Sequence, residues 1–171
     1  MTSAAPPTIH LVCGLVAAGK TTFAKRLAEE LPAVRLSRDE WMIRLHGVAY
    51  DDPAYAQLLA PCNELLWDLA LEVLRIGGSV ILDWNFWSRA LRADALRRSR
   101  EAGTALQLHW VDVPLDTAVQ QARSRLISPT PGAHQVDDAG VGHSAVIFEP
   151  PTESEGLPVI RHGAGPHPTR D

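Results

Sequence analysis

The sequence predicts an α/β fold in which a mainly parallel β-sheet is covered by helices on both faces. Short, mainly apolar runs, such as residues 9–13, and the continuous apolar run 80–82 are typical of strands that are buried on both sides. These runs alternate with longer segments in which apolar residues recur every three or four positions, as they do in helices. Because alternating strands and helices pack as βαβ units, this order of elements favours a parallel sheet.

The first part of the chain predicts two strand–helix pairs. They are a strand at residues 8–13, a helix at 20–31, a strand at 33–36 and a helix at 38–46. Phe23, Leu27 and Leu31 form the apolar stripe of the first helix. We expect the Ser37 hydroxyl to cap the second helix by accepting hydrogen bonds from free backbone N–H groups, and Gly47 to end it in the left-handed conformation.

Three further helices and three strands are expected in the rest of the chain. They are a long helix reaching residue 76, a strand at 80–82, a helix at 88–102, a strand at 106–111, a helix at 114–126 and a strand at 158–160. The long helix is indicated by apolar residues at three- and four-residue spacings, and Gly77 and Gly78 stop it. Pro61 either starts this helix or kinks it.

A polar stretch without clear periodicity, at about residues 127–147, is expected to form a loop or lid. Gly140 and Gly142 are among the residues that punctuate it. Residues 163–171 are expected to form a loose tail. We expect residues 1–171 to be a single domain, because their number suits one core of ordinary size and the sequence shows no internal repeat.

The stretch after the first strand matches a phosphate-binding loop. Residues 14–21, Gly-Leu-Val-Ala-Ala-Gly-Lys-Thr, fit the pattern G-x-x-x-x-G-K-S/T without a mismatch. In such a loop, backbone N–H groups wrap a polyphosphate, the lysine ammonium reaches its outer phosphates, and the hydroxyl contacts Mg²⁺. A glycine turn before an ordinary helix is the alternative interpretation. The residues expected to bind nucleoside triphosphate here are Gly14, Ala17, Ala18, Gly19, Lys20, Thr21 and Thr22.

Acidic residues follow two of the predicted strands at the point where the strand ends. Ligands bind at this edge of parallel sheets, so these side chains could share one crevice. Asp83 stands where phosphate-loop proteins commonly place an acid near Mg²⁺, although a turn or helix cap would also use it. Asp39 begins a helix, where its carboxylate either accepts a proton from a substrate hydroxyl or only interacts with the helix dipole.

Arginines are candidates for stabilising the charge that develops during phosphoryl transfer. Arg123 and Arg125 stand near the start of the irregular segment, where they could act as lid residues; a solvated helix end is the alternative and suits one of the two. We count Arg123 among the nucleotide-binding residues. Five arginines between positions 89 and 100 form a basic helix, which is usually a solvated face, and only Arg89, the nearest to Asn85, is expected to contact substrate.

Tryptophans are numerous for a chain with few aromatic residues. Trp41, Trp84 and Trp87 flank the two acids, and walls of an apolar substrate pocket and core packing are equally good interpretations for them. Core packing is favoured for Trp67 and Trp110.

Composition and charge favour a free small molecule as the partner. The net charge of -4 and the pI near 5.9 give no general attraction to nucleic acid or to an anionic membrane. Cys13 and Cys62 fit small core residues better than a disulfide, and this favours a reducing cytoplasm. Residues 1–7 lack the features of a secretion signal, and no window is long enough for a membrane span. The histidines and cysteines form no metal-ligand pattern, so we expect no metal beyond nucleotide-bound Mg²⁺.

The chain resembles the small bacterial P-loop kinases of the AAA-type ATP-binding protein family, relatives of polynucleotide kinase, zeta toxin and chloramphenicol phosphotransferase. The resemblance covers most of residues 8–155. It rests on residues 14–22, Leu-Ser-Arg-Asp-Glu-Trp at 36–41, Leu-Asp-Trp-Asn-Phe-Trp-Ser-Arg at 82–89, Asp-Val-Pro-Leu-Asp at 112–116 and Phe-Glu-Pro-Pro-Thr at 148–152. It implies a P-loop NTPase fold with five parallel strands in the order 2-3-1-4-5, and ATP and Mg²⁺ as cofactors.

The resemblance also implies roles for individual residues. Asp39 matches the acid that activates the acceptor hydroxyl, and Asp83 with Asn85 matches the D-x-N motif after the third strand. Arg125 matches the lid arginine. The residues implied to border the adenine are Phe148 and Pro150.

Two positions depart from the pattern of these relatives. Val16-Ala17-Ala18 stands where Pro-Gly-Ser or Gly-Ser is common, so the loop lacks a flexible glycine. Met42 stands where the polynucleotide kinase branch has an arginine three positions after its acid, and this argues against a 5′-hydroxyl nucleic-acid substrate.

The sequence thus predicts an ATP-dependent kinase that phosphorylates a hydroxyl of a small organic molecule, such as a nucleoside, sugar or antibiotic. The expected catalytic residues are Asp39, Lys20 and Arg125; the expected substrate contacts are Asp39, Trp41, Trp84, Asn85, Trp87 and Arg89; the expected metal ligands are Thr21 and Asp83. A polynucleotide 5′-hydroxyl kinase and an ATP-binding switch or sequestering protein without transfer activity are the alternatives.

Overall fold

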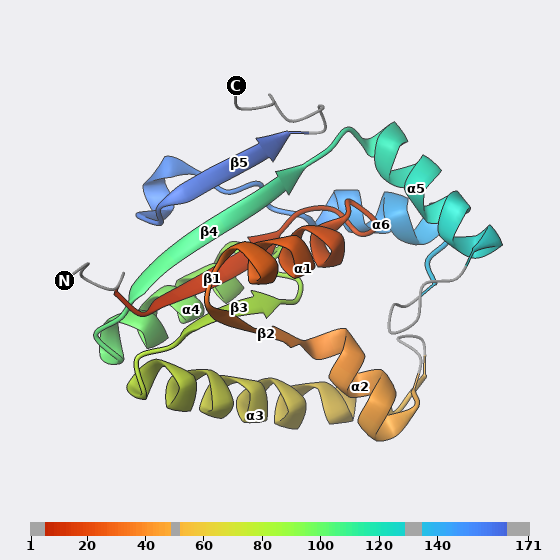
Figure 1. Cartoon of the computed structure of the whole chain (residues 1–171). Helices are drawn as coiled ribbons and strands as arrows, with labels where there is room; N and C mark the ends of the chain where they lie inside the picture. The colour runs from red at the N-terminus through yellow and green to blue at the C-terminus, as the bar shows by residue number, and fades with distance from the viewer. Residues whose placement is uncertain (1–5, 49–51, 129–134, 164–171) are drawn as a thin grey trace.

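A five-stranded, all-parallel sheet forms the centre of the computed structural model, which describes residues 6–48, 52–128 and 135–163 (Figure 1). The strands are β1 (Thr8–Cys13), β2 (Ala33–Ser37), β3 (Ser79–Asp83), β4 (Ala105–Asp112) and β5 (Val159–Gly163). Their spatial order is β2-β3-β1-β4-β5, and each neighbouring pair is parallel. This order confirms the predicted P-loop NTPase sheet.

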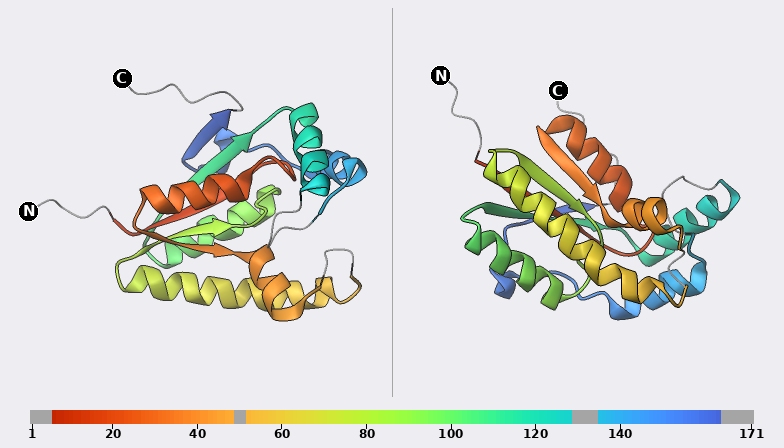
Figure 2. Two further views of the ribbon diagram at one scale, coloured as in Figure 1. Left: turned by 45° about the vertical axis from the view of Figure 1, so that its right-hand side comes forward. Right: turned by 90° about the horizontal axis from the view of Figure 1, so that it is seen from below.

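Helices cover both faces of the sheet (Figure 2). The helical segments are α1 (Lys20–Glu30), α2 (Arg38–His46), α3 (Tyr55–Arg75), α4 (Arg89–Glu101), α5 (Leu115–Ile127), α6 (Asp138–Ile147) and the short 3₁₀ helix η1 (Glu153–Glu155). Each of the expected strands and helices is present, with bounds that either agree with the prediction, as for β1 and α2, or differ from it by one or a few residues. None of the described helices is long and apolar enough to cross a membrane.

Two apolar cores hold the helices to the sheet. On one face Leu66 and Trp67 of α3 pack with strand residues that include Leu11 and Leu82. On the other face α1, α5 and α6 pack against alternate strand residues, which include Val12, Ile81 and Val111. Both faces of the central strands are therefore buried, and this is why the strands read as continuous apolar runs. Cys13 and Cys62 are free thiols within the buried part of the structure.

Two local predictions need correction, and one of the two alternatives for Pro61 is excluded. Ser37 occupies the N-cap position of α2, but its side chain makes no capping hydrogen bond; the first turn instead carries the acids Asp39 and Glu40, whose charge suits that end of the helix. Pro61 lies inside α3 and does not start it. The stretch expected to lack regular structure contains α6, whose N-cap Asp137 accepts a hydrogen bond of 2.8 Å from the backbone N–H of Gly140.

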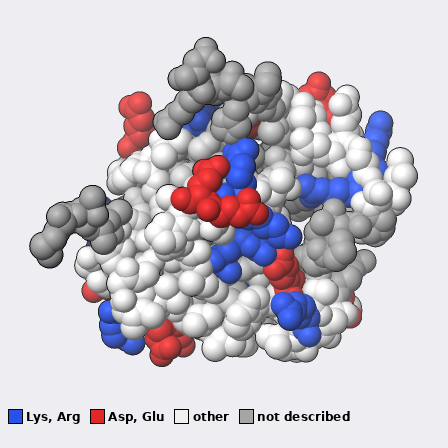
Figure 3. Space-filling model, in the orientation of Figure 1, with Lys and Arg blue, Asp and Glu red and all other residues white. Residues whose placement is uncertain are grey.

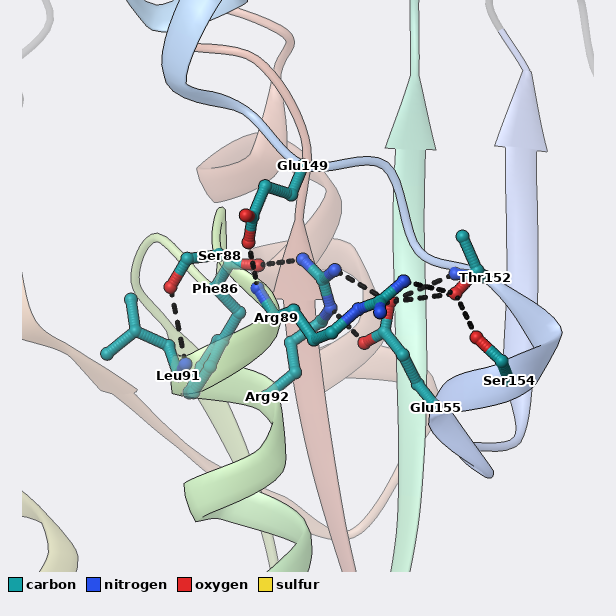
Figure 4. Close-up of polar contacts among 9 residues, drawn as sticks. All are labelled: Phe86, Ser88, Arg89, Leu91, Arg92, Glu149, Thr152, Ser154 and Glu155. Atoms are coloured by element: carbon teal, nitrogen blue, oxygen red, sulfur yellow. Dashed lines mark hydrogen bonds and ion pairs between the residues drawn. The ribbon is translucent and has the colours of Figure 1, made fainter.

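The arginine-rich helix α4 is also more than a solvated face. The Arg92 side chain is 0% exposed and donates to both carboxylate oxygens of Glu155, at 2.7 and 2.8 Å, and to the Phe86 carbonyl at 2.9 Å (Figure 4). Arg89, one turn earlier, donates to the Thr152 hydroxyl at 3.0 Å. These contacts fasten α4 to the chain that leads from α6 to β5. Loss of one partner of such a buried pair typically costs about 3–5 kcal/mol.

Three histidines connect strands β1, β4 and β5 beneath α1. Nδ1 of His10 lies 3.1 Å from Nε2 of His109, and Nδ1 of His109 lies 3.0 Å from Nε2 of His162. The ring of Phe23 from α1 lies 4.4 Å, centroid to centroid, from the His162 ring. Burial, together with the smaller effects of neighbouring His10 and His162, lowers the pKa of His109 to about 3. The folded protein therefore holds His109 neutral at ordinary pH.

We expect the free energy of unfolding to fall as the pH is lowered from 6.5 toward 3. In this range the unfolded chain binds a proton at His109 that the folded chain does not, so acid favours unfolding. The contribution of this one group approaches about 1.4 kcal/mol per pH unit. Urea unfolding across this pH range measures the slope. The slope should be shallower in His109→Gln but unchanged in His46→Gln, whose side chain is exposed; equal slopes in all three proteins would contradict the prediction.

Candidate active site

The strand order brings the predicted site residues to one edge of the sheet. The phosphate-binding loop follows β1, Asp39 lies in α2 directly after β2, and Asp83 ends β3. β3 lies between β1 and β2, and Ser37 is in register with Asp83. Helices α2, α5 and α6 surround the same edge, toward which the strand arrows of Figure 1 point.

Backbone geometry explains two residues of the phosphate-binding loop. Gly14 has φ +145°, and a Cβ atom there would lie 2.4 Å from the backbone oxygen of Val111 in β4, so only glycine fits. Ala17 has φ +63°, and no other non-glycine residue in the described parts of the chain has a positive φ. This conformation costs a residue with a Cβ roughly 1–2 kcal/mol. The loop therefore adopts a left-handed residue at the place where the sequence lacks the usual glycine.

The Lys20 side chain folds back onto the phosphate-binding loop and binds its backbone. Its ammonium donates to the backbone oxygens of Leu15, at 2.7 Å, and of Gly14, at 3.2 Å. Burial lowers the pKa of Lys20 to about 8; the charges of Asp39 and Asp83 oppose this shift, and that of Arg125 adds to it. The four side chains that the sequence predicted to act together are thus close enough to interact electrostatically.

Thr21 and Asp83 form a small oxygen site beside this lysine. The Thr21 hydroxyl donates to Oδ1 of Asp83 at 3.3 Å, and the other carboxylate oxygen accepts from Arg35 at 2.6 Å. The Asp83 side chain is 3% exposed; burial raises its pKa, and the Arg35 guanidinium opposes that shift. A hydroxyl and a carboxylate are oxygen ligands of the kind that Mg²⁺ prefers, so these residues fit the predicted metal role.

One carboxylate oxygen of Asp39 makes no hydrogen bond. In the described residues, three buried side-chain atoms lack a hydrogen-bond partner: Nε of Arg38, Oδ1 of Asp39 and Oδ1 of Asn63. Two of these atoms belong to neighbouring residues at the start of α2, and they lie 3.5 Å apart. Oδ1 thus faces the Arg38 guanidinium, whereas the Asp39 side chain as a whole is 36% exposed, so the carboxylate can be reached by a hydroxyl of a bound molecule. From the sequence, Arg38 lies in a segment expected at this edge but has no role of its own, because a basic residue beside an acid at a helix start has no distinctive spacing.

Helix α6, which lies in the predicted lid region, contacts both the phosphate-binding loop and the preceding helix α5. The exposed Arg123 of α5 forms an ion pair with Asp138 of α6. The Ser144 hydroxyl of α6 accepts a hydrogen bond from the backbone N–H of Val16 at 3.3 Å. Arg125 is half-buried, and it makes no ion pair with any described side chain. Of the two arginines, Arg125 therefore has its charge available at the site. Residues 129–134 of the predicted lid lie outside the described residues.

The predicted substrate contacts divide into two groups. Trp84 is 5% exposed and packs against Trp67 and Phe86, with centroid distances of 5.9 and 5.5 Å, so we leave it out of the proposed acceptor site. Arg89 points toward Thr152 in Figure 4 and is engaged there. The partly buried side chains that stay as predictions are Trp41, Asn85 and Trp87.

The residues predicted at the adenine lie in the chain that follows α6. The Phe148 ring is half-buried, 6.4 Å from that of Trp110, and Pro150 is exposed. The backbone N–H of Glu149 donates to the carbonyl of Trp87 at 2.9 Å, which fixes this chain beside the end of β3. The adenine role of Phe148 and Pro150, and that of the exposed Thr22 at the phosphates, stay predictions.

A family model for the AAA domain matches residues 9–151. A candidate kinase from Chloroflexus aurantiacus J-10-fl has a TM-score of 0.73 at 24% identity, over 93% of this chain and 89% of that one. The structure of Chaetomium thermophilum Kti12 in complex with ADP-AlF3 has a TM-score of 0.68 at 17% identity, and the match covers 91% of this chain and 89% of that one. The structure of Mycobacterium tuberculosis APS kinase in complex with AMPPNP and APS has a TM-score of 0.61 at 18% identity, and the match covers 98% of this chain and 92% of that one. At these sequence identities, the TM-scores show that the three proteins share the fold of this chain. No curated protein matches the chain.

We expect Gly14→Ala to displace the loop, because the new methyl group would overlap the Val111 backbone. The melting temperature should fall, consistent with an overpacking cost of about 1–3 kcal/mol, and affinity for a fluorescent ATP analogue should drop. Gly142→Ala is the matched control, since a Cβ there has no atom within 4 Å and alanine favours the helix. Wild-type melting and affinity in Gly14→Ala would contradict this account of the loop.

Proposed function

The chain belongs to the AAA-domain family and has the fold of small P-loop kinases, and from this we propose that it transfers a phosphoryl group from ATP to a hydroxyl of a small organic molecule. The observation that carries the proposal is the Asp39 carboxylate at the edge that also holds Lys20: its side chain is 36% exposed, and its Oδ1 makes no hydrogen bond and has the Arg38 guanidinium 3.5 Å away. The phosphate-binding loop alone would fit an ATP-binding switch as well as it fits a kinase. A partly exposed carboxylate beside the loop supplies the proton acceptor that hydroxyl activation needs.

The loop and its neighbours would hold the triphosphate. Backbone N–H groups of residues 14–21 would bind phosphate oxygens, and Lys20 would exchange the Gly14 and Leu15 carbonyls for the outer phosphates. Thr21 and Asp83 would hold Mg²⁺, which when bound supplies positive charge to the phosphate oxygens. The solved complexes of Kti12 with ADP-AlF3 and of APS kinase with AMPPNP support a nucleotide ligand for this fold.

Asp39 would act on the acceptor as general base. The acceptor oxygen forms a bond to the γ-phosphorus, the bond from that phosphorus to the β–γ bridging oxygen breaks, and ADP leaves. The hydroxyl proton passes to the Asp39 carboxylate. Arg125, half-buried and without an ion pair among the described side chains, would offset negative charge on the transferred group.

A small acceptor in the cytoplasm, such as a nucleoside, sugar or antibiotic, fits the chain best. The net charge of -4 gives no general attraction for a nucleic acid or an anionic membrane, and Met42 replaces the arginine of the polynucleotide kinase branch. The partly buried Trp41 and Trp87 would wall the acceptor side, with Asn85 as a polar contact.

We expect Asp39→Asn to bind ATP as the wild type does but to transfer phosphate about 100- to 10,000-fold more slowly, the usual contribution of a positioned base. Phosphate transfer from labelled ATP to a panel of hydroxyl compounds measures this rate, and a fluorescent ATP analogue measures binding. Asp68→Asn, which changes an exposed acid in α3, is the matched control.

Three other outcomes would count against the proposal. Equal rates for Asp39→Asn and wild type on every acceptor would remove the base role. Transfer only to a short 5′-hydroxyl oligonucleotide would favour a polynucleotide kinase. Tight ATP binding without transfer or hydrolysis would favour a switch or sequestering protein.

A further inference from the structure

One arginine connects the proposed metal ligand to the helix that carries the proposed base. Arg35 lies in the middle of β2, next to β3. One of its terminal nitrogens donates to Oδ2 of Asp83 at 2.6 Å. The other donates to both carboxylate oxygens of Glu40, at 2.7 Å each, in the first turn of α2. Asp39, the proposed base, is the residue before Glu40.

A second cation completes a row of alternating charges. Lys25 of α1 lies 3.5 Å from Glu40, so the row runs from Lys25 through Glu40 and Arg35 to Asp83. Figure 3 shows charged side chains of both signs gathered over α1 and toward α2, on a face that is otherwise largely uncharged. The row becomes more buried toward the site: the Lys25 side chain is 49% exposed and that of Arg35 is 15% exposed.

The shape of the guanidinium makes this link directional. Its two terminal nitrogens are fixed in one plane, so an arginine that serves Asp83 and Glu40 sets the orientation of both carboxylates. With Oδ2 of Asp83 taken by Arg35, Oδ1 is directed to the Thr21 hydroxyl. A lysine would supply the same charge from one point, without the fork.

We propose that Arg35 is a positioning residue that orients Asp83 toward Thr21 for Mg²⁺ and, through Glu40, places the start of α2 against that site. This inference rests on the proposed nucleotide site but not on the transfer reaction or its acceptor. It separates Arg35 from a residue that only neutralises a buried charge, because orientation needs the fork and neutralisation does not.

The test compares the affinity of a fluorescent ATP analogue in EDTA with its affinity in Mg²⁺. The metal-dependent gain in affinity reports on Thr21 and Asp83, and no acceptor is needed. In Arg35→Lys and Arg35→Met we expect an unchanged affinity in EDTA and a gain that is about 10- to 100-fold smaller, as is usual when a partner of a metal ligand is removed. Arg26→Met, which changes an arginine paired with Glu30 on the exposed side of α1, should keep the full gain.

Glu40→Gln provides the test if the Arg35 variants do not unfold cooperatively. This substitution leaves the pair between Arg35 and Asp83 in place and weakens only the contact of Arg35 with α2. The metal-dependent gain in affinity should therefore fall, but by less than in the Arg35 variants. A full gain in Arg35→Lys would reduce Arg35 to charge neutralisation and overturn the proposal. A full gain in Glu40→Gln would overturn the proposed link to α2. An equal loss of affinity in EDTA and in Mg²⁺ in the Arg35 variants would overturn the proposed orientation of Asp83. A wild type that transfers no phosphate but shows the metal gain would overturn only the proposed function.

Discussion

The site depends on compensating one buried carboxylate. Asp83 ends a central strand with its side chain almost fully enclosed, and an unpaired charge in such a place costs several kcal/mol. Thr21 and Arg35 reach it from two other elements, α1 and β2, and Arg35 is itself paired with Glu40 of α2. The phosphate-binding loop, the predicted metal ligand and the helix of the predicted base are therefore parts of one electrostatic unit, and a change in any of them alters the surroundings of the others.

Features encoded by neighbouring residues could be predicted from the sequence. β1 was expected at residues 8–13 and is found there, since a short, mainly apolar run suits a strand covered on both faces. The loop motif fixed the start of α1 at Lys20, and Gly47 ends α2 with φ +65° as expected. Because strand ends in a parallel sheet meet at one edge, the gathering of Lys20, Asp39 and Asp83 also followed from the order of elements.

Features that need a distant partner could not be predicted. Arg92 looked like one of several exposed arginines, because its partner Glu155 lies 63 positions further along the chain. Arg35 carried no signal for the same reason, since Asp83 follows 48 positions later. Helix α6 was not predicted because its two glycines obscure the helical period. It is stabilised by burial of Val141 in the core that also contains Val12 and Val111. Local patterns report which face of an element is apolar, and they do not report which charge will be drawn inside.

The two hydrogen bonds from Lys20 to the carbonyls of Gly14 and Leu15 bear on a common laboratory practice. Replacing the lysine of such a loop is the customary way to make an inactive reference protein. In this chain the same ammonium also links two backbone carbonyls of the loop, in which Ala17 already has an unfavourable backbone conformation. A Lys20 variant would therefore remove a structural brace along with a phosphate contact. Its defect would measure the sum of both, and it would be a poor blank against which to judge nucleotide binding alone.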